Sequence, residues 1–190
     1  DSSLGDGASM GIHESQSRLW ENVIGRSFAF WKGQYPLLKQ LFSDQLADVS
    51  VEEFYAAVNR VQPSLIRVDA DEVTYSLHVI LRFELERKLF SGNLTVTDLP
   101  EAWNGMMQEI LGVKPDSDAN GVLQDVHWSM GAFGYFPSYA LGNLYGLQIW
   151  EALQADIPNV EASIEQKNYA PILQWLRAQV HVHGCRYEPK

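Results

Sequence analysis

Hydrophobic residues recur every four positions in the middle of the chain, and this spacing constrains the fold more than any other feature. The members of the repeat are Val73, Leu77, Leu81, Leu85 and Leu89. Residues four apart lie on one face of a helix. Asp69 and Glu72 precede the repeat with the spacing of a capping box, and Gly92 follows it as a typical helix C-cap. The repeat therefore predicts one long amphipathic helix between Asp69 and Gly92.

The remaining sequence indicates further helices and almost no strands. Ser50 and Glu53 form a second capping box, and prolines mark several other helix starts. The only strand signal, at residues 94–96, is too short to matter. The expected helices cover about residues 12–27, 37–46, 50–61, 98–111, 123–130 and 137–155, with two later helices starting at Pro158 and Pro171. No repeat or linker divides the chain, so we expect an all-α, multi-helix fold and a single helical domain over residues 1–190.

The composition is that of a globular protein from a reducing compartment. Hydrophobic residues make up 46% of the chain and aromatic residues 12%, which excludes a disordered tail and allows a sizeable core. The net charge of -10 argues against a nucleic-acid partner, because phosphate binding needs clustered lysine and arginine. No apolar run approaches the roughly 18 residues of a membrane span, so no membrane association is expected. Cys185 is the only cysteine, which excludes an internal disulfide and favours the cytoplasm.

Three short strings in the chain carry the functional signal. They are His13–Arg18 (HESQSR), Ile66–Tyr75 (IRVDADEVTY) and Gly121–Trp128 (GVLQDVHW). In this order they resemble the signatures of the M32 metallocarboxypeptidases, the thermostable (Taq-type) carboxypeptidase family. One mild departure is Val73, where that family more often has leucine.

The H-E-x-x-H zinc motif of that family is absent from these residues. His13-Glu14 is the only His-Glu dipeptide, and Ser17 stands where the second histidine would be. A serine cannot replace a neutral imidazole as a zinc ligand. Because family members are considerably longer, the resemblance implies that the chain is an interior-to-C-terminal fragment of an M32 enzyme.

The resemblance also implies a fold and an activity. The fold would be part of the helical zinc-peptidase (neurolysin-like) fold, and the parent protein would be a zinc-dependent carboxypeptidase acting on peptide substrates. The cofactor would be zinc, or another divalent ion such as cobalt, and a homodimer is usual in the family. One carboxylate rarely holds zinc, so we expect the fragment to bind the metal incompletely and to be inactive alone. The alternative is a non-catalytic helical protein-interaction domain, in which Glu14, Arg67 and His127 would lie on separate faces.

Glu14 is the expected metal ligand. In the family the glutamate of the H-E-S string is the third zinc ligand, and a carboxylate added to two imidazoles leaves an open position for water. Without the resemblance, an isolated glutamate on a mostly apolar helix is more often solvated or close to a helix cap. His13 would point about 100° away from Glu14 on a helix, so we expect it to pack behind the metal ligands.

Arg67 is the expected substrate-binding residue. The family's motif arginine implies a clamp for the C-terminal carboxylate of the substrate, whose two oxygens match the guanidinium fork. The alternative is a surface arginine, or one paired with Asp69 or Asp71. Asp71 and Glu72 are expected at the helix start rather than in catalysis.

His127 and a tyrosine that follows it are the expected catalytic residues. In the family string, His127 faces the active-site cleft and can donate a hydrogen bond to the substrate or the developing oxyanion, while Asp125 orients a neighbouring group. Tyr139, twelve residues later, is the first candidate for a second oxyanion donor, and Tyr135 is the next. The alternatives are a hydrogen-bonded core histidine and an aromatic core around a helix start.

The other chemistry-bearing residues are predicted to be structural. His181 and His183 follow a helix and precede Gly184, so we expect a helix-end role rather than metal binding. Cys185 lacks the surroundings of a nucleophile. No G-x-S-x-G elbow or Cys-His pair supports a metal-independent hydrolase.

Overall fold

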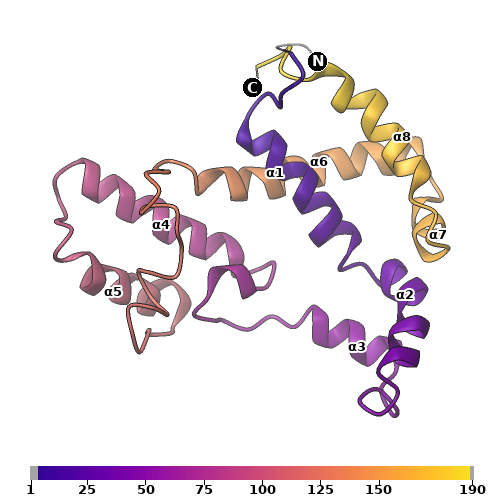
Figure 1. The fold of residues 1–190 in the computed structure, drawn as a ribbon, viewed down its shortest axis with the longest axis horizontal. Coiled ribbons are helices and arrows are strands. Elements are labelled where there is room, and N and C mark those ends of the chain that lie inside the picture. The colour runs from indigo at the N-terminus through magenta and orange to yellow at the C-terminus, as the bar shows by residue number, and fades with distance from the viewer. Residues whose placement is uncertain (1–3, 189–190) are drawn as a thin grey trace. The chain divides into compact units, whose positions relative to one another are not determined.

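The computed structural model describes residues 4–188, which form helices and turns (Figure 1). No strand occurs in this part of the chain, so the all-α prediction is confirmed. Residue contacts group the chain into two units, the first made of residues 1–59 and 141–190 and the second of residues 60–140. The single helical domain expected over residues 1–190 stays a prediction. Within residues 4–188, no helix combines the length and the apolar character needed to cross a bilayer.

The first unit is built from helices at both ends of the chain. The helix predicted over residues 12–27 is present at nearly its expected length, because an α-helix continues there directly into a π-helix. The elements are α1 (Met10–Arg18), the π-helix (Leu19–Ile24), α2 (Phe28–Leu41), α3 (Val51–Val58), α6 (Pro137–Asp156), α7 (Val160–Glu165), α8 (Ala170–Gln179) and a 3-10 turn (His181–His183). Residues 137–140 of α6 belong to the second unit.

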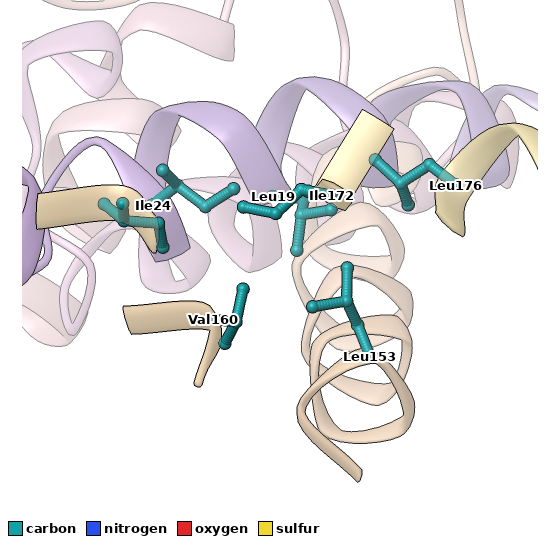
Figure 2. Packing of buried hydrophobic residues seen from close by; sticks show 7 residues of the cluster. Leu19, Ile24, Leu153, Val160, Ile172 and Leu176 are labelled. Atoms are coloured by element: carbon teal, nitrogen blue, oxygen red, sulfur yellow. The ribbon is translucent and has the colours of Figure 1, made fainter. Parts of the chain in front are cut away.

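An apolar cluster holds the helices of the first unit together. Figure 2 shows Leu19 and Ile24 from the π-helix meeting Leu153 from α6, with residues of α7 and α8 completing the cluster. Burying each aliphatic side chain stabilises the fold by about 1.5–3 kcal/mol. The buried members are Leu19, Ile24, Leu153, Val160, Ile164, Ile172 and Leu176.

The sequence predicts a helix start at Pro36, but this residue lies inside α2. The helix begins earlier, at Phe28, because Ser27 Oγ accepts a hydrogen bond from the backbone N–H of Phe30 at 3.1 Å and caps the first turn. Proline has no N–H, so α2 continues through Pro36 with one hydrogen bond fewer. The packing of α2 against α7 maintains the helix beyond this point.

The capping box at the start of α3 is confirmed. The backbone N–H of Ser50 donates to Glu53 Oε2 at 2.8 Å, and the backbone N–H of Glu53 donates to Ser50 Oγ at 3.1 Å. Both bonds satisfy N–H groups that the helix itself leaves without partners. The helix ends at Val58, three residues before the predicted end at Val61.

The second unit pairs two helices around another apolar cluster. A 3-10 turn (Arg67–Asp69) precedes α4 (Tyr75–Phe90), and α5 (Leu99–Leu111) packs against α4. Leu81 and Leu85 are fully buried, as the four-residue repeat predicts. The buried members are Leu81, Leu85, Leu99, Trp103, Met107 and Leu111.

The capping box predicted for Asp69 and Glu72 is wrong, because the N-cap residue of α4 is Thr74, whose side chain makes no capping bond. Asp71 instead holds the turn that leads into the helix. Asp71 Oδ1 accepts hydrogen bonds from the backbone N–H groups of Val73 and Thr74, each at 2.9 Å. Burial opposes the ionisation of Asp71, but hydrogen bonds from surrounding residues outweigh it and lower its pKa. The first residue of the repeat, Val73, lies outside α4 and is exposed.

Residues 123–130 form turns and bends rather than the predicted short helix. The side chains of Gln124 and Asp125 both bond to Arg82, and Gln124 also accepts from the backbone of Arg67. These contacts with other elements outweigh the local helical preference. The conformation of this segment is therefore determined by its contacts with Arg67 and Arg82 rather than by its helical periodicity.

Candidate functional site

Glu14 lies where α1 crosses α6 at close range. A Cβ atom at Gly142 would stand 2.7 Å from Glu14 Cβ, and one at Gly146 would stand 3.2 Å from the carbonyl oxygen of Ser15. The two helix backbones therefore touch at the glycines, and Glu14 is half-buried there. Its Oε2 accepts a hydrogen bond from Ser17 Oγ at 3.1 Å. The crossing fixes the position of Glu14 within the first unit.

The histidines of the first unit do not gather into a metal site. His13 is exposed and borders a pocket of about 330 Å³ that Gln16 and His181 also line. His181 Nε2 lies 2.9 Å from Gln16 Oε1, in a 3-10 turn after α8, which agrees with the predicted helix-end position. Among residues 4–188, no group of three or more histidine, cysteine, aspartate and glutamate side chains could hold a metal ion. Glu14 therefore does not complete a metal site with the described residues.

Arg67 is buried in the second unit and forms an ion pair with Asp125. Arg67 Nη2 donates to Asp125 Oδ1 at 2.6 Å, and Nε donates to the same oxygen at 3.1 Å. Nη1 donates to the hydroxyl of Tyr75 at 2.9 Å, and the guanidinium carbon lies 4.8 Å from the ring centre of Tyr139. Arg67 is only 5% exposed. It is therefore not a surface arginine, and its ion-pair partner is Asp125 rather than Asp69 or Asp71.

A second arginine, Arg82 on α4, shares the carboxylate of Asp125. Arg82 Nε donates to Asp125 Oδ2 at 2.6 Å, and Nη2 donates to Gln124 Oε1 at 2.8 Å. The backbone N–H of Arg67 donates to the same amide oxygen at 2.9 Å. Arg82 has no exposed surface, and its guanidinium carbon lies 4.6 Å from the ring centre of Trp103. We call Arg67, Arg82 and Asp125 the arginine cluster.

His127 joins the arginine cluster to a group of aromatic rings. Its Nε2 lies 3.1 Å from the hydroxyl oxygen of Tyr139. Its Nδ1 lies 3.9 Å from Asp125 Oδ1, which is too far for a hydrogen bond. The imidazole packs against Phe136, with 4.4 Å between ring centres, and against Tyr135, with 5.5 Å. Both predicted tyrosines therefore contact His127, and Tyr139 does so through its hydroxyl.

Glu86 ties the residues after His127 to α4. It is buried, one turn after Arg82. Its Oε1 accepts a hydrogen bond from the indole N–H of Trp128 at 2.6 Å, and Oε2 accepts one from the backbone N–H of Gly134 at 2.9 Å. Hydrogen bonds to a charged group are stronger than those between neutral groups. The turn-rich segment is therefore fixed at two points six residues apart.

The charges of the arginine cluster control its protonation states. Burial alone would raise the pKa of Asp125, but the hydrogen bond from Arg67 and the positive charges of Arg82 and Arg67 lower it. Burial lowers the pKa of Arg82 to about 10, although Asp125 opposes this change. Burial also lowers the pKa of His127, and the two arginines act in the same direction. At neutral pH the cluster therefore has a net charge of about +1, beside a neutral imidazole.

His78 is buried one turn before Arg82. The backbone of Ser64 interacts weakly with its ring, but neither ring nitrogen has a partner with hydrogen-bond geometry. Burial lowers the pKa of His78 to about 4, and the charges of Arg82 and Arg67 act in the same direction. The ring is therefore neutral at neutral pH.

The second unit brings together four of the five residues predicted for the site. These are Arg67, His127, Tyr135 and Tyr139. Asp125, which was expected to orient a neighbouring group, lies between Arg67 and His127. Glu14 belongs to the first unit, so its place in the same site stays a prediction.

Sequence reasoning missed the buried polar residues of α4 that hold this site. His78, Arg82 and Glu86 recur every four residues, directly beside the leucine repeat. This row of polar residues is the signal that could have identified them, because the helix face next to the leucine repeat is also buried by neighbouring parts of the fold. Charged residues are rarely buried without partners. The row therefore predicts a polar network.

The chain is similar along its length to known metallopeptidases. Residues 1–190 match the family described as Carboxypeptidase Taq (M32) metallopeptidase. Thermostable carboxypeptidase 1 of Thermus thermophilus and Carboxypeptidase 1 of Bacillus subtilis are each 50% identical to it over 186 residues. These alignments cover 98% of the chain but 36% and 37% of the two relatives, so the chain spans little more than a third of their length.

Solved structures share the fold. The crystal structure of the M32 carboxypeptidase from Deinococcus radiodurans is 49% identical with a TM-score of 0.91, covering 98% of this chain and 38% of that one. The carboxypeptidase of Pyrococcus furiosus is 43% identical with a TM-score of 0.92, covering 98% of this chain and 37% of that one. The predicted helical zinc-peptidase (neurolysin-like) fold is thereby confirmed. With a family match over all 190 residues and half of the aligned residues identical to those of two carboxypeptidases, the chain belongs to the M32 metallopeptidase family.

Proposed function

We propose that the whole protein is a zinc-dependent carboxypeptidase that releases single residues from the C-termini of peptides, and that this chain supplies part of its active site. The curated relatives are named carboxypeptidases, and the family is one of metallopeptidases. The observation that carries the proposal is the contact between the arginine cluster and His127 with Tyr139, which joins a cation to hydrogen-bond donors. A C-terminal exopeptidase needs both kinds of group.

Arg67 would bind the terminal carboxylate of the peptide. A guanidinium has five N–H groups. Asp125 accepts hydrogen bonds from the Nε–H and from one Nη2–H, and the Tyr75 hydroxyl accepts one from Nη1. Each terminal nitrogen retains one N–H, which is the number that bidentate binding of a carboxylate requires. A second carboxylate would also neutralise the net positive charge of the arginine cluster.

His127 and Tyr139 would stabilise the oxyanion that forms when the peptide carbonyl is attacked. Their 3.1 Å contact places an imidazole N–H and a hydroxyl on one side of the site, where each can turn a donor toward a developing negative charge. Tyr135, which packs on the same imidazole, is the second candidate. A purely aromatic core would explain the ring packing. It would not explain why Nδ1 of His127 is buried without a partner, which is unfavourable by about 1–3 kcal/mol.

Glu14 would be one ligand of the zinc ion. Zinc sites in peptidases combine imidazole and carboxylate ligands. The described residues do not supply the rest of such a site, so the 190 residues alone should bind zinc weakly and be inactive. When bound by the whole protein, zinc, or another divalent ion such as cobalt, would polarise a water molecule and the peptide carbonyl.

The free carboxylate of the substrate provides the sharpest test. The full-length gene product that contains this chain should cleave N-acylated dipeptides and should leave the corresponding C-terminal amides intact. Arg67→Gln should raise KM about tenfold or more, because it removes charge-assisted hydrogen bonds. Arg87→Gln is the matched control, since Arg87 is exposed and pairs only with Glu84 among the described ion pairs. Equal cleavage of acids and amides would refute the clamp.

Metal dependence separates this proposal from its rival. Chelation should abolish cleavage, and zinc should restore it. A metal-loaded full-length protein without peptidase activity would favour the non-catalytic interaction domain.

We also propose a cytoplasmic protein that acts on peptides rather than on nucleic acids or membranes, and that forms a homodimer. Sedimentation of the full-length gene product tests the dimer.

A further inference from the structure

One side of α4 carries three buried polar residues at intervals of one helical turn. His78 and Arg82 have no exposed surface, and Glu86 is 4% exposed. Burying a charged side chain is unfavourable unless its partners compensate for the lost water. Arg82 Nη1 donates to the backbone carbonyl of His78 on the same helix. The other hydrogen-bond partners of Arg82 and Glu86 lie within one stretch, residues 124–134, which contains His127. We call this stretch the His127 segment.

We propose that Arg82 and Glu86 are positioning residues, which hold the two ends of the His127 segment and thereby place His127 and Arg67 for the substrate. This inference rests on the proposed function, because Arg67 and His127 meet a substrate only in that proposal. The two positioning residues do not themselves touch the reacting groups. Arg82 acts through Asp125 at the start of the segment, and Glu86 acts through Trp128 near its middle and Gly134 at its end.

Arg82 acts on the start of the His127 segment. The two oxygens of Asp125 have separate short contacts, Oδ1 with Arg67 Nη2 and Oδ2 with Arg82 Nε, each at 2.6 Å. The carboxylate cannot rotate without losing one of them. Without Arg82, Asp125 would pair with Arg67 alone and cancel its charge. Arg82 therefore maintains both the orientation of Arg67 and the net positive charge that a substrate carboxylate would meet.

Glu86 acts on the rest of the His127 segment. Trp128 is the neighbour of His127 in the sequence, and its indole N–H is bound by one oxygen of Glu86, while the other oxygen binds the backbone of Gly134. A glutamine at this position has one acceptor oxygen and could keep only one of these two bonds. The segment would then be free at one of its anchors, and the imidazole of His127 would lose its fixed direction.

The test compares buried residues with exposed residues of the same type on the same helix. Arg82→Met, Arg82→Lys and Glu86→Gln would be made in the full-length gene product. Arg87→Met and Glu84→Gln are the matched controls, because these two side chains pair with each other away from the buried side of α4. The readouts are kcat and KM on an N-acylated dipeptide, the melting temperature, and the pH titration of the ¹³C-labelled His127 ring by NMR.

We expect Arg82→Met to raise KM about tenfold or more, since it removes charge-assisted hydrogen bonds and the net charge of the cluster. The His127 titration should move to higher pH, because one nearby positive charge is lost. Arg82→Lys should recover part of the KM, because it keeps the charge without the fork. Glu86→Gln should lower kcat about tenfold with a smaller change in KM. The two controls should match wild type in all readouts.

Two outcomes would overturn the inference. The first is that Arg82→Met and Glu86→Gln lower the melting temperature but leave kcat, KM and the His127 titration at their wild-type values, which is the behaviour of purely structural residues. The second outcome concerns the case in which Arg82→Met does not fold. A wild-type KM in Arg82→Lys would then refute the claim that the guanidinium fork of Arg82 orients Asp125 and Arg67. If the wild-type protein cleaves no peptide, the proposed function fails. The NMR titration then still shows whether the two residues act on His127, and an unchanged titration in both variants would overturn the inference.

Discussion

Replacing Gly142 by alanine should destabilise the first unit, whereas the same replacement at Gly105 should stabilise the second. Within a helix, alanine is more favourable than glycine by about 1 kcal/mol. Gly105 lies in α5, and a Cβ atom there would meet nothing within 4 Å, so this gain should be realised in full. A Cβ atom at Gly142 would lie 2.7 Å from Glu14 Cβ and 3.0 Å from its carbonyl carbon. Carbon atoms normally approach to about 3.5–4.0 Å.

The size of this overlap decides the sign of the effect at Gly142. Relieving it requires α1 and α6 to separate, and overpacking of this kind destabilises by about 1–3 kcal/mol. Subtracting the helix gain of about 1 kcal/mol leaves a net loss of up to about 2 kcal/mol. The two alanine variants should therefore differ by about 1–3 kcal/mol in the free energy of unfolding.

Urea denaturation followed by circular dichroism measures this difference. With an m-value of about 2 kcal/mol per molar, a change of 1 kcal/mol moves the midpoint by about 0.5 M. The midpoint of Gly105→Ala should rise and that of Gly142→Ala should fall relative to wild type. Equal stabilisation by both substitutions would show that α1 and α6 do not touch at Gly142, and would remove the argument that the crossing fixes Glu14.

Three further predictions follow from the described contacts. In the folded protein the pKa of His78 is about 4, below the usual 6.5, so the stability from its neutral ring is present above pH 6.5 and is lost as the pH falls toward 4. The variant His78→Leu should therefore weaken the pH dependence of the urea midpoint between pH 7 and 4.5. An unchanged dependence would contradict this. Ser50→Ala should lower the free energy of unfolding by about 1 kcal/mol through loss of the capping box, whereas exposed Ser43→Ala should change it little. The 190-residue chain should bind zinc more weakly than about 1 μM in chelator competition, and nanomolar binding would disprove that Glu14 is its only ligand.

The sequence was sufficient for the helices whose faces and ends it encodes locally. The leucine repeat predicted α4, and a serine and a glutamate three residues apart predicted the start of α3. It was insufficient where distant contacts outweigh local signals. Pro36 suggested a helix start, but Ser27 caps an earlier one. Residues 123–130 have helical periodicity, but their side chains bond to arginines far away in the chain.

The candidate site could be predicted only as far as the resemblance to the M32 family assigns roles to individual residues. Arg67 and His127 were identified from their sequence strings and Tyr139 from its spacing after His127, and the three meet in the second unit. Asp125 was expected near a catalytic group, but its two arginine partners could not be deduced from spacing, because they lie 58 and 43 residues away. Arg82 was missed for the same reason: a charged residue beside a leucine stripe looks like a solvated one until its partner is known.

The complete burial of Arg82 determines how the site should respond to its surroundings. At about 0.1 M salt, mobile ions screen interactions between exposed charges over about 10 Å of water, but they screen buried pairs of charges much less. The guanidinium of Arg82 has no exposed surface, so mobile ions cannot surround it. The attraction between this cluster and a carboxylate bound beside Arg67 should therefore depend less on salt concentration than the attraction of an anion to lysines on the protein surface.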